Sequence, residues 1–421
     1  MLNQAIRLAA ACILTAGLPA LGVLGSPAAS AQGIGQQVRA DEMPELQKID
    51  VPAAWRVTKG AGVTVAVLDT GVDPAIPDLT GSVITGPDYT LGADPPGYQP
   101  PHLHGTYIAS LIAGHGSGPG RASGVIGVAP DARILSVRVI LDDQEPGLNV
   151  YNENAKYADA IPDGIRYAVG HGAQVINMSL GSTIPTRATR LAIGYAISHN
   201  VVVVASAGNE GTAGGGFTPY SYPASFTGVI SVAAVGATGR RASFSDRNAS
   251  VVISAPGVNI VGAGPGGEYL IASGTSPAAA FVSGVVALIR SKYPQLVPAL
   301  VTQALVTSAR HRPAAGYSPS IGFGEVDAVA ALSAAGRLAA QRPAAGLSAS
   351  AHFGPGPPGP IQVVHRSYRK IVALGVLAGV AALGFLLVLT LLVMQVLRGR
   401  GQRAAERNVS VDGGNMAVTE T

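Results

Sequence analysis

Residues 63–69 read VTVAVLD, a short run of apolar, mostly β-branched residues that ends on a carboxylate. An apolar run without alternation of apolar and polar residues is typical of a central strand whose two faces are both covered. Four further runs of this kind, all mostly apolar, occur at residues 132–137, 174–178, 201–205 and 229–235. Together they predict the strands of a parallel sheet.

Helix-like segments lie between these runs, at residues 106–113, 155–171 and 187–198, and after the last run, at residues 277–292. Strands that alternate with helices are typical of right-handed crossovers that place helices on both sides of a sheet. We therefore predict an α/β fold with a doubly wound, mostly parallel sheet and helices on both faces.

Polar residues stand where predicted strands end and where two predicted helices begin. Asp69 follows the first strand, Ser179-Leu180-Gly181 follows the third, and Asn209 comes shortly after the fourth. His104 and Ser276 each open a helix. Because functional groups of an open parallel sheet gather beyond the carboxyl ends of its strands, we expect these side chains to converge. A carboxylate, an imidazole, a hydroxyl and an amide are the groups needed for acyl transfer through a serine nucleophile.

Each of these groups has a chemical role in such a reaction. Ser276 is a weak nucleophile until a base takes its proton, and His104 can be that base because the unperturbed pKa of histidine lies near neutral. Asp69 would hold the imidazole in one tautomer and stabilise the imidazolium. The Asn209 side chain and the backbone N–H of Ser276 would donate hydrogen bonds to the oxyanion. Asp246 and Asp73 are expected to be structural.

The chain resembles the subtilase (subtilisin-like) serine peptidase family in segments that occur in the family's order: VAVLDTGVD at 65–73, HGTYIASLIAG at 104–114, INMSLG at 176–181, SAGNEG at 206–211 and ASGTSPAAAFVSGVVALI at 272–289. The similarity runs from about residue 51 to residue 335. It implies a subtilisin-like fold and the activity of a serine endopeptidase that needs no cofactor.

The resemblance assigns roles residue by residue. It makes Asp69, His104 and Ser276 the catalytic triad and Asn209 the oxyanion donor. It also implies two backbone edges that bind a protein or peptide substrate by β-augmentation, formed by Ser179, Leu180 and Gly181 and by Ser206, Ala207 and Gly208.

The chain departs from the family pattern after the nucleophile and after the catalytic histidine. Pro277 stands where methionine is usual, and Phe281 stands where histidine is usual. Many subtilases bind calcium soon after the histidine, but residues 115–121 contain no carboxylate, although Asp78 stands at a familiar position. Calcium needs several oxygen ligands, so we expect no metal site there. The pair His102 and His104 is expected to leave one solvated histidine and not a metal site.

The net charge of +4 reflects the two ends of the chain. Residues 32–364 contain 20 Lys and Arg against 21 Asp and Glu, so the surplus lies outside them. The extra cations flank apolar runs, a pattern that indicates the orientation of membrane segments and not a surface that binds nucleic acid. We therefore expect no nucleic-acid partner.

Residues 1–31 have one cation, an apolar stretch and the small-residue ending Ala-Ser-Ala, which are the features of a secretory signal peptide. The alternative, an N-terminal membrane anchor, does not explain that ending. Cys12 is the single cysteine and lies inside this segment. The mature chain would have no cysteine, which excludes disulfides, thiol catalysis and cysteine-zinc sites.

The remaining divisions follow from composition. Residues 32–50 form an N-terminal arm that we expect to pack on the peptidase domain at 51–338. An Ala/Pro/Gly-rich linker at 339–370 leads to residues 371–397, which carry no charge and are long enough for a transmembrane helix. After signal-peptide cleavage the catalytic domain is expected to lie outside the cell membrane and the polar tail at 398–421 in the cytoplasm, and the distribution of cations around the apolar segment agrees with this. The tail is expected to lack regular structure.

A finer resemblance is to the mycosins, the membrane-anchored subtilases associated with type VII secretion. It rests on the signal peptide, the single C-terminal anchor, the absence of a large pro-domain and the FVSG sequence at 281–284. It implies partners in a membrane secretion complex. Two alternatives stay open: a mainly structural scaffold in that complex with dispensable proteolysis, and a general degradative protease, for which an anchor has no purpose.

Overall fold

The structure is a computed structural model that describes residues 13–14, 27–341 and 368–412. These residues fall into two units: a body that ends near Pro343, and a C-terminal unit that contains one long helix. The expected signal peptide and linker lie largely outside the described residues.

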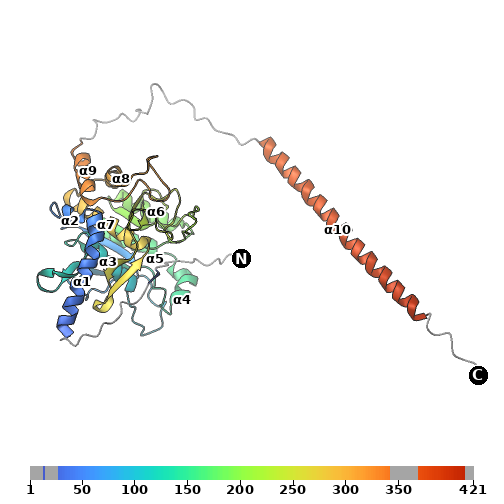
Figure 1. The fold of residues 1–421 in the computed structure, drawn as a ribbon, viewed down its shortest axis with the longest axis horizontal. Helices are drawn as coiled ribbons and strands as arrows, with labels where there is room; N and C mark the ends of the chain where they lie inside the picture. Colours follow the sequence, from blue (N-terminus) through green and yellow to red (C-terminus); the bar gives the residue numbers. More distant parts are fainter. Residues whose placement is uncertain (1–12, 15–26, 342–367, 413–421) are drawn as a thin grey trace, which may run out of the picture. The chain divides into compact units, whose positions relative to one another are not determined.

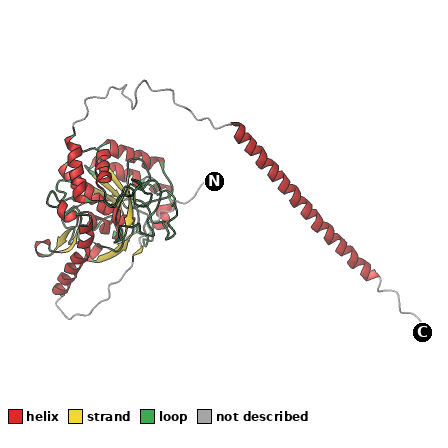
Figure 2. Cartoon of the chain, turned by 45° about the horizontal axis from the view of Figure 1, so that its top comes forward, coloured by secondary structure: helices red, strands yellow, loops and turns green. Residues whose placement is uncertain are grey.

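A seven-stranded sheet forms the centre of the body (Figures 1 and 2). Its strand order is β10-β9-β8-β7-β2-β6-β3, and every pair of neighbours is parallel. The strands are β2 (Thr64–Asp69), β3 (Val83–Asp88), β6 (Arg133–Arg138), β7 (Val175–Met178), β8 (Val202–Ser206), β9 (Ile230–Val235) and β10 (Ile253–Pro256). The predicted parallel sheet is thus confirmed, and the two edge strands β3 and β10 are additions to it.

Consecutive residues of each central strand pack into different cores. Val65 and Val67 of β2 belong to one hydrophobic cluster, whereas Ala66 and Leu68 belong to another. Successive side chains of a strand point to opposite faces, so both faces of this sheet are buried. This explains why the strand sequences are apolar without alternation.

Helices cover both faces of the sheet, as predicted, and Figure 2 shows the strands enclosed between them. One face packs against α3 (Leu103–Ala113), α7 (Thr275–Lys292), α8 (Pro298–Ser308) and α9 (Ala328–Ala340). The other packs against α4 (Leu148–Glu153), α5 (Ala160–Gly170) and α6 (Arg187–Ser198). The single helix expected at 155–171 is divided into the short 3₁₀ helix Ala155–Tyr157 and α5.

The strand order reverses next to β2, which lies between β6 and β7. In open parallel sheets, a crevice for ligands forms beyond the strand ends at such a switch point. Helix α3 approaches this edge closely, because a Cβ added to Gly105 would lie 2.0 Å from the carbonyl oxygen of Gly71. Glycine therefore allows the start of α3 to contact the loop after β2.

Two small antiparallel sheets complete the body. One pairs β4 (His115–Ser117) with β5 (Ser123–Ile126), and the other has the order β1-β12-β11. The latter contains β1 (Ile13–Leu14), β11 (Ile260–Ala263) and β12 (Tyr269–Ser273), which leads directly into α7. Ile13 pairs with Ser273 and Leu14 with Ala272, so the edge of β12 is able to bind an extended segment.

The N-terminal arm is helical. Helix α1 (Pro27–Lys48) packs on β5 and is followed by the short helix α2 (Val51–Ala54). Arg39 donates hydrogen bonds to the carbonyl oxygens of Gly124 at 2.9 Å and Ser123 at 3.1 Å. Glu42 is buried and accepts from the N–H of Ile126 at 2.8 Å, and burial raises its pKa well above the usual range. The Arg39 guanidinium thus binds carbonyl oxygens at the start of β5, shortly after the segment at residues 115–121.

The C-terminal unit contains α10 (Tyr368–Asp412). Its segment Val372–Met394 has a mean hydropathy of 2.8 over 23 residues and is long enough to cross a membrane. The helix continues to Asp412, so the expectation that the tail lacks regular structure is wrong for its first part. Residues 402–407 read QRAAER, and all of these residue types favour helices, which explains the continuation.

Candidate active site

The first pair in the candidate site joins the end of β2 to the start of α3. Asp69 has no exposed surface, and its Oδ1 accepts hydrogen bonds from the N–H of Thr70 at 2.8 Å and from His104 Nδ1 at 2.7 Å. A carboxylate can only accept, so the Nδ1 atom carries the proton. The imidazole is thereby fixed in the tautomer whose Nε2 accepts a proton.

A second carboxylate holds the first turn of α3. Asp142 Oδ2 accepts from the N–H of Leu103 at 3.0 Å, and Oδ1 accepts from the N–H of His104 at 3.1 Å. The first N–H groups of a helix have no partner within the helix, and a negative charge there is favourable. Burial raises the pKa of Asp142, while the charge of His104 and these two hydrogen bonds lower it. Sequence reasoning missed Asp142, because it lies 38 residues from His104 in the chain.

Asp142 is itself held by a buried ionic cluster. Glu145 accepts from the N–H of Asp142 at 2.8 Å and from Arg138 at 2.5 Å. Arg138 also pairs with Asp88 at 2.9 Å and with Asp94 at 3.2 Å. The cluster therefore links the end of β6 and the end of β3 to the backbone that carries His104.

Replacing Asp142 with asparagine is expected to lower kcat about 10-fold and to leave KM nearly unchanged. The two N–H groups at the start of α3 each bind one oxygen of Asp142, but the side chain of asparagine has only one oxygen. The first turn of α3 and the His104 ring therefore lose their fixed position, and small misplacements of a catalytic group lower the rate strongly. Loss of the negative charge also disfavours the imidazolium, so the acid limb of the kcat/KM profile should move to lower pH.

Asp143 supplies the matched control. It carries the same charge and interacts electrostatically with His104, but it makes none of the hydrogen bonds to the start of α3. We expect Asp143→Asn to shift the acid limb slightly and to keep kcat at the pH optimum. Equal losses of kcat in the two variants would contradict a positioning role for Asp142.

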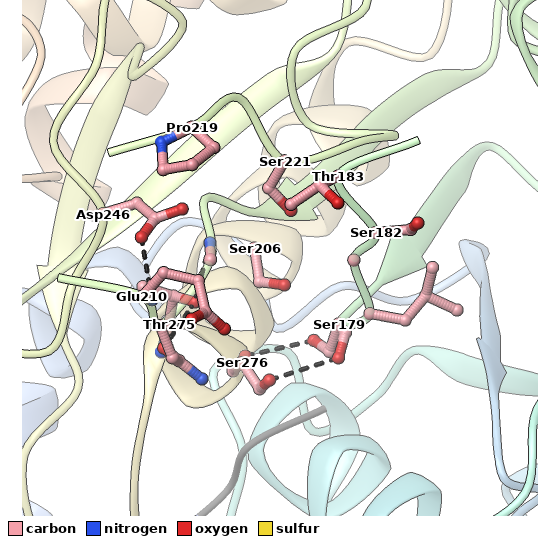
Figure 3. Close-up of a pocket in the computed structure, with 14 residues that line it drawn as sticks. Ser179, Ser182, Thr183, Ser206, Glu210, Pro219, Ser221, Asp246, Thr275 and Ser276 are labelled. Carbon is pink, nitrogen blue, oxygen red and sulfur yellow. Dashed lines mark hydrogen bonds between the residues drawn. The ribbon is translucent and has the colours of Figure 1, made fainter. Parts of the chain in front are cut away.

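The candidate nucleophile lies at the start of α7. Ser276 is the second residue of this helix and is 4% exposed. Its Oγ donates to the carbonyl oxygen of Ser179 at 3.1 Å, and Ser179 Oγ lies 3.1 Å from the carbonyl oxygen of Ser276 (Figure 3). Ser276 is thus held against the segment that follows β7. The backbone N–H of Ser276 belongs to the first turn, where a developing negative charge is stabilised.

The side chain of Asn209 is oriented by Thr275. Asn209 Oδ1 accepts both the N–H of Thr275 at 2.9 Å and its hydroxyl at 3.0 Å, and the N–H of Gly208 in turn donates to that hydroxyl at 3.2 Å. The amide oxygen is therefore engaged with Thr275. The Nδ2 donor lies 3.5 Å from where a Cβ on Gly274 would stand, close to the start of α7.

A pocket adjoins Ser276. It has a volume of about 40 Å³ and is lined by Ser179, Leu180, Gly181, Ser182, Thr183, Ser206, Gly208, Asn209, Glu210, Pro219, Ser221, Asp246, Thr275 and Ser276 (Figure 3). All but one of the residues expected in the substrate cleft thus occur here. The exception is Ala207, which packs in an apolar cluster with Ala233 and Val251.

A larger and mostly apolar pocket lies beside His104. Its volume is about 280 Å³, and its lining includes Leu103, Tyr107, Leu141 and Leu270 together with His104. Sequence reasoning missed this pocket, because its residues come from four separate segments. Among the residues that the structure describes, no group of three or more His, Cys, Asp or Glu side chains is arranged to hold a metal ion. His102 Nδ1 lies 2.7 Å from the carbonyl oxygen of Thr70, a backbone partner.

The sequence model of the subtilase family matches residues 60–324, which is more than half of the chain. This chain belongs to the subtilase family. It is therefore a hydrolase, a serine peptidase with a subtilisin-like fold.

This subtilase is similar to curated and structurally known members of the family. It is 36% identical over 262 residues to "Intracellular serine protease" of Paenibacillus polymyxa, which covers 62% of this chain and 76% of that protein. It is also similar to the crystal structure of MycP1 from Mycobacterium smegmatis, with 30% identity and a TM-score of 0.58 over 68% of this chain and 83% of that one. MycP3, a protease of the type VII (ESX-3) secretion system, gives 34% identity and a TM-score of 0.56 over 69% and 87%.

Proposed function

We propose that this subtilase is a membrane-anchored, extracytoplasmic serine endopeptidase in which Asp69, His104 and Ser276 form the catalytic triad. The observation that carries the proposal is the 2.7 Å hydrogen bond between the buried Asp69 carboxylate and His104 Nδ1. A structural histidine would need no buried carboxylate to fix its tautomer. Here the fixed tautomer leaves Nε2 as the base.

The reaction proceeds by acyl transfer. The hydrogen bond from Ser276 Oγ to the carbonyl oxygen of Ser179 breaks, and Oγ gives its proton to His104 Nε2 as it attacks the scissile carbonyl carbon. The imidazolium then protonates the leaving amine, the C–N bond breaks, and an acyl-enzyme remains on Ser276. A water molecule, deprotonated by His104, hydrolyses this ester and restores the serine hydroxyl.

The oxyanion of each tetrahedral intermediate binds beside the start of α7. Asn209 Nδ2 and the backbone N–H of Ser276 are the proposed donors, and Thr275 keeps the amide in the required orientation. One such donor contributes about 2.7–4 kcal/mol to the transition state in subtilisin, another member of this family.

The peptide substrate binds as an added strand. The segments Ser179–Gly181 and Ser206–Gly208 are the proposed edges on one side of the scissile bond. The edge of β12 is a third, because it pairs with the extended segment β1 just before Ser276. Removal of residues 1–31 as a signal peptide would open that edge for substrate.

The test of this function is hydrolysis of a mixture of peptides by the detergent-solubilised full chain. New peptide termini, identified by mass spectrometry, should appear with the parent protein and be absent with Ser276→Ala. A folded parent protein that produces no new termini would contradict the assignment as an endopeptidase.

The topology has its own test. Single cysteines at position 131, which is exposed on the body, and at position 406 in the tail can be treated with a membrane-impermeant maleimide on intact cells. We expect Asp131→Cys to react and Glu406→Cys to react only after lysis. The opposite result would place the catalytic domain in the cytoplasm.

The role in type VII secretion is supported by the similarity to MycP1 and MycP3 together with the apolar helix α10. One MycP1 structure is described as an essential component of a type VII system, which also favours the second candidate, a scaffold. A deletion strain complemented with Ser276→Ala separates them. Restored secretion would favour the scaffold, whereas failure by a normally abundant variant would show that proteolysis is the required activity.

A further inference from the structure

The pocket beside Ser276 contains a buried carboxylate that the mechanism does not use. Asp246 is 1% exposed and lines this pocket. Its Oδ1 accepts from the N–H of Glu210 at 2.8 Å, and its other oxygen points toward the space between Ser206 and Ser221 (Figure 3). A Cβ added to Gly208, whose φ is +113°, would lie 2.2 Å from Asp246 Oδ2. Glycine at 208 thus makes room for this carboxylate.

No cation among the described residues of the body forms an ion pair with Asp246. Arg241 acts on it electrostatically, but its guanidinium donates to backbone carbonyl oxygens, including those of Ser243 at 3.0 Å and Thr212 at 3.0 Å. Buried charges in proteins are ordinarily paired. The carboxylate has hydrogen bonds with the N–H of Glu210 and with the side chain of Thr218, but neither of these groups is charged. A carboxylate in a substrate cleft without a cationic partner therefore favours a cationic group brought by the substrate.

The walls of the pocket suit a narrow and polar group. A Cβ on Gly181 would lie 2.4 Å from Ser221 Oγ, so these two walls stand close together. Hydroxyl-bearing residues, Ser182, Thr183, Ser206 and Ser221, make up much of the lining. An ammonium group on a linear chain fits this shape, and the hydroxyls can accept its hydrogen bonds.

We propose that this pocket binds the side chain of the residue before the scissile bond and selects lysine through Asp246. The proposal rests on the serine peptidase function proposed above and names its substrate class: proteins or peptides with an accessible lysine at the cleavage point. The ammonium group pairs with Asp246 Oδ2 at the end of the pocket. Glu210, which is exposed and also lines the pocket, adds a weaker and more screened attraction.

Peptidyl diphenyl phosphonates test this selection, because they modify the nucleophilic serine once and need no further turnover. Two probes should be compared that differ only in the recognised side chain: lysine, and norleucine as its uncharged linear counterpart. We expect the lysine probe to modify Ser276 of the full chain at least about 10-fold faster, since discrimination by a paired charge is of this order or larger. Equal rates, or faster reaction of the norleucine probe, would overturn the proposal.

The variant Asp246→Asn keeps an acceptor for the N–H of Glu210 and removes the charge. It should abolish the preference for lysine and leave the rate with the norleucine probe unchanged or higher. Asp143→Asn, a charge change at a residue that lines the other pocket, should leave the ratio of the two rates unaltered. A ratio that is unchanged by Asp246→Asn, or lowered equally by both variants, would show that Asp246 does not select the substrate.

A fluorophosphonate without a peptide distinguishes failure of the substrate inference from failure of the proposed peptidase function. If it labels Ser276 equally in the parent protein and in Asp246→Asn while the lysine preference is absent, only the substrate inference fails. If it labels neither protein, the proposed function itself fails.

The selection should also depend on pH. Burial raises the pKa of Asp246 to about 7, and the nearby Glu210 charge acts in the same direction. The hydrogen bonds with the Glu210 N–H and the Thr218 side chain, and the charge of Arg241, act in the opposite direction. The carboxylate of the free enzyme is therefore largely protonated at pH 6 and charged at pH 8. The ratio of lysine to norleucine rates should rise across this range, and effects of His104 ionisation cancel because both probes need the same base.

Discussion

The variant Ser276→Ala is expected to hydrolyse peptides about 10⁶-fold more slowly than the parent protein, with kcat carrying the loss. Without the hydroxyl no acyl-enzyme forms, and only substrate binding and the oxyanion donors remain. Ser276 is buried at the start of α7, and its Oγ donates to the carbonyl oxygen of Ser179. Alanine removes one oxygen atom and keeps the helix, so we expect the fold to be preserved.

Steady-state kinetics on any peptide that the parent protein cleaves will measure this effect. Ser179→Ala is the matched control, because it removes a hydroxyl from the same hydrogen-bonded pair but not the nucleophile. A loss of less than about 100-fold in Ser276→Ala would mean that another group performs the chemistry.

The variant Asp69→Asn should lower kcat about 10⁴-fold at neutral pH. The Asp69 carboxylate is fully buried and accepts the Nδ1 proton of His104 at 2.7 Å. An asparagine in its place can present its NH₂ group to the imidazole, which stabilises the tautomer with the proton on Nε2. His104 would then be unable to take the proton of Ser276, which is the loss known for this substitution in another serine protease.

The melting temperature and the binding of a peptide inhibitor distinguish this explanation from misfolding. A wrong tautomer should leave the melting temperature and the binding of a peptide inhibitor close to those of the parent protein, while the rate falls. The tautomer argument is falsified if Asp69→Asn retains more than a tenth of the parent kcat, or if its loss of activity is matched by loss of the folded state.

Residues that lie inside long apolar or motif-rich segments could be placed from the sequence. The runs at 63–68 and 201–205 form β2 and β8 within one residue of the predicted bounds, because both faces of these strands are buried. His104 and Ser276 open α3 and α7 as expected. Consecutive residues in one strand or helix carry this information, so it is local.

Other features depend on contacts between distant segments. Strand β3 reads VITGPD and lies at the edge of the sheet, where partial exposure removes the apolar signal and its glycine and proline resemble a loop. Asp142 caps α3 from a loop after β6, and the apolar pocket draws on four segments. The sequence predicts a structural role for Asp246, and the role that we propose for it depends on the pocket that it lines together with Ser276.

Mapping of the residue that a fluorophosphonate modifies tests the proposed catalytic triad most directly. The detergent-solubilised full chain is incubated with the probe, digested and analysed by mass spectrometry, with His104→Ala and Asp69→Asn treated in parallel. We predict a stoichiometric adduct on Ser276 in the parent protein and a rate of modification lowered at least about 100-fold in both variants. A folded parent protein without an adduct, an adduct on a different residue, or equal rates in all three proteins would contradict a triad of Asp69, His104 and Ser276.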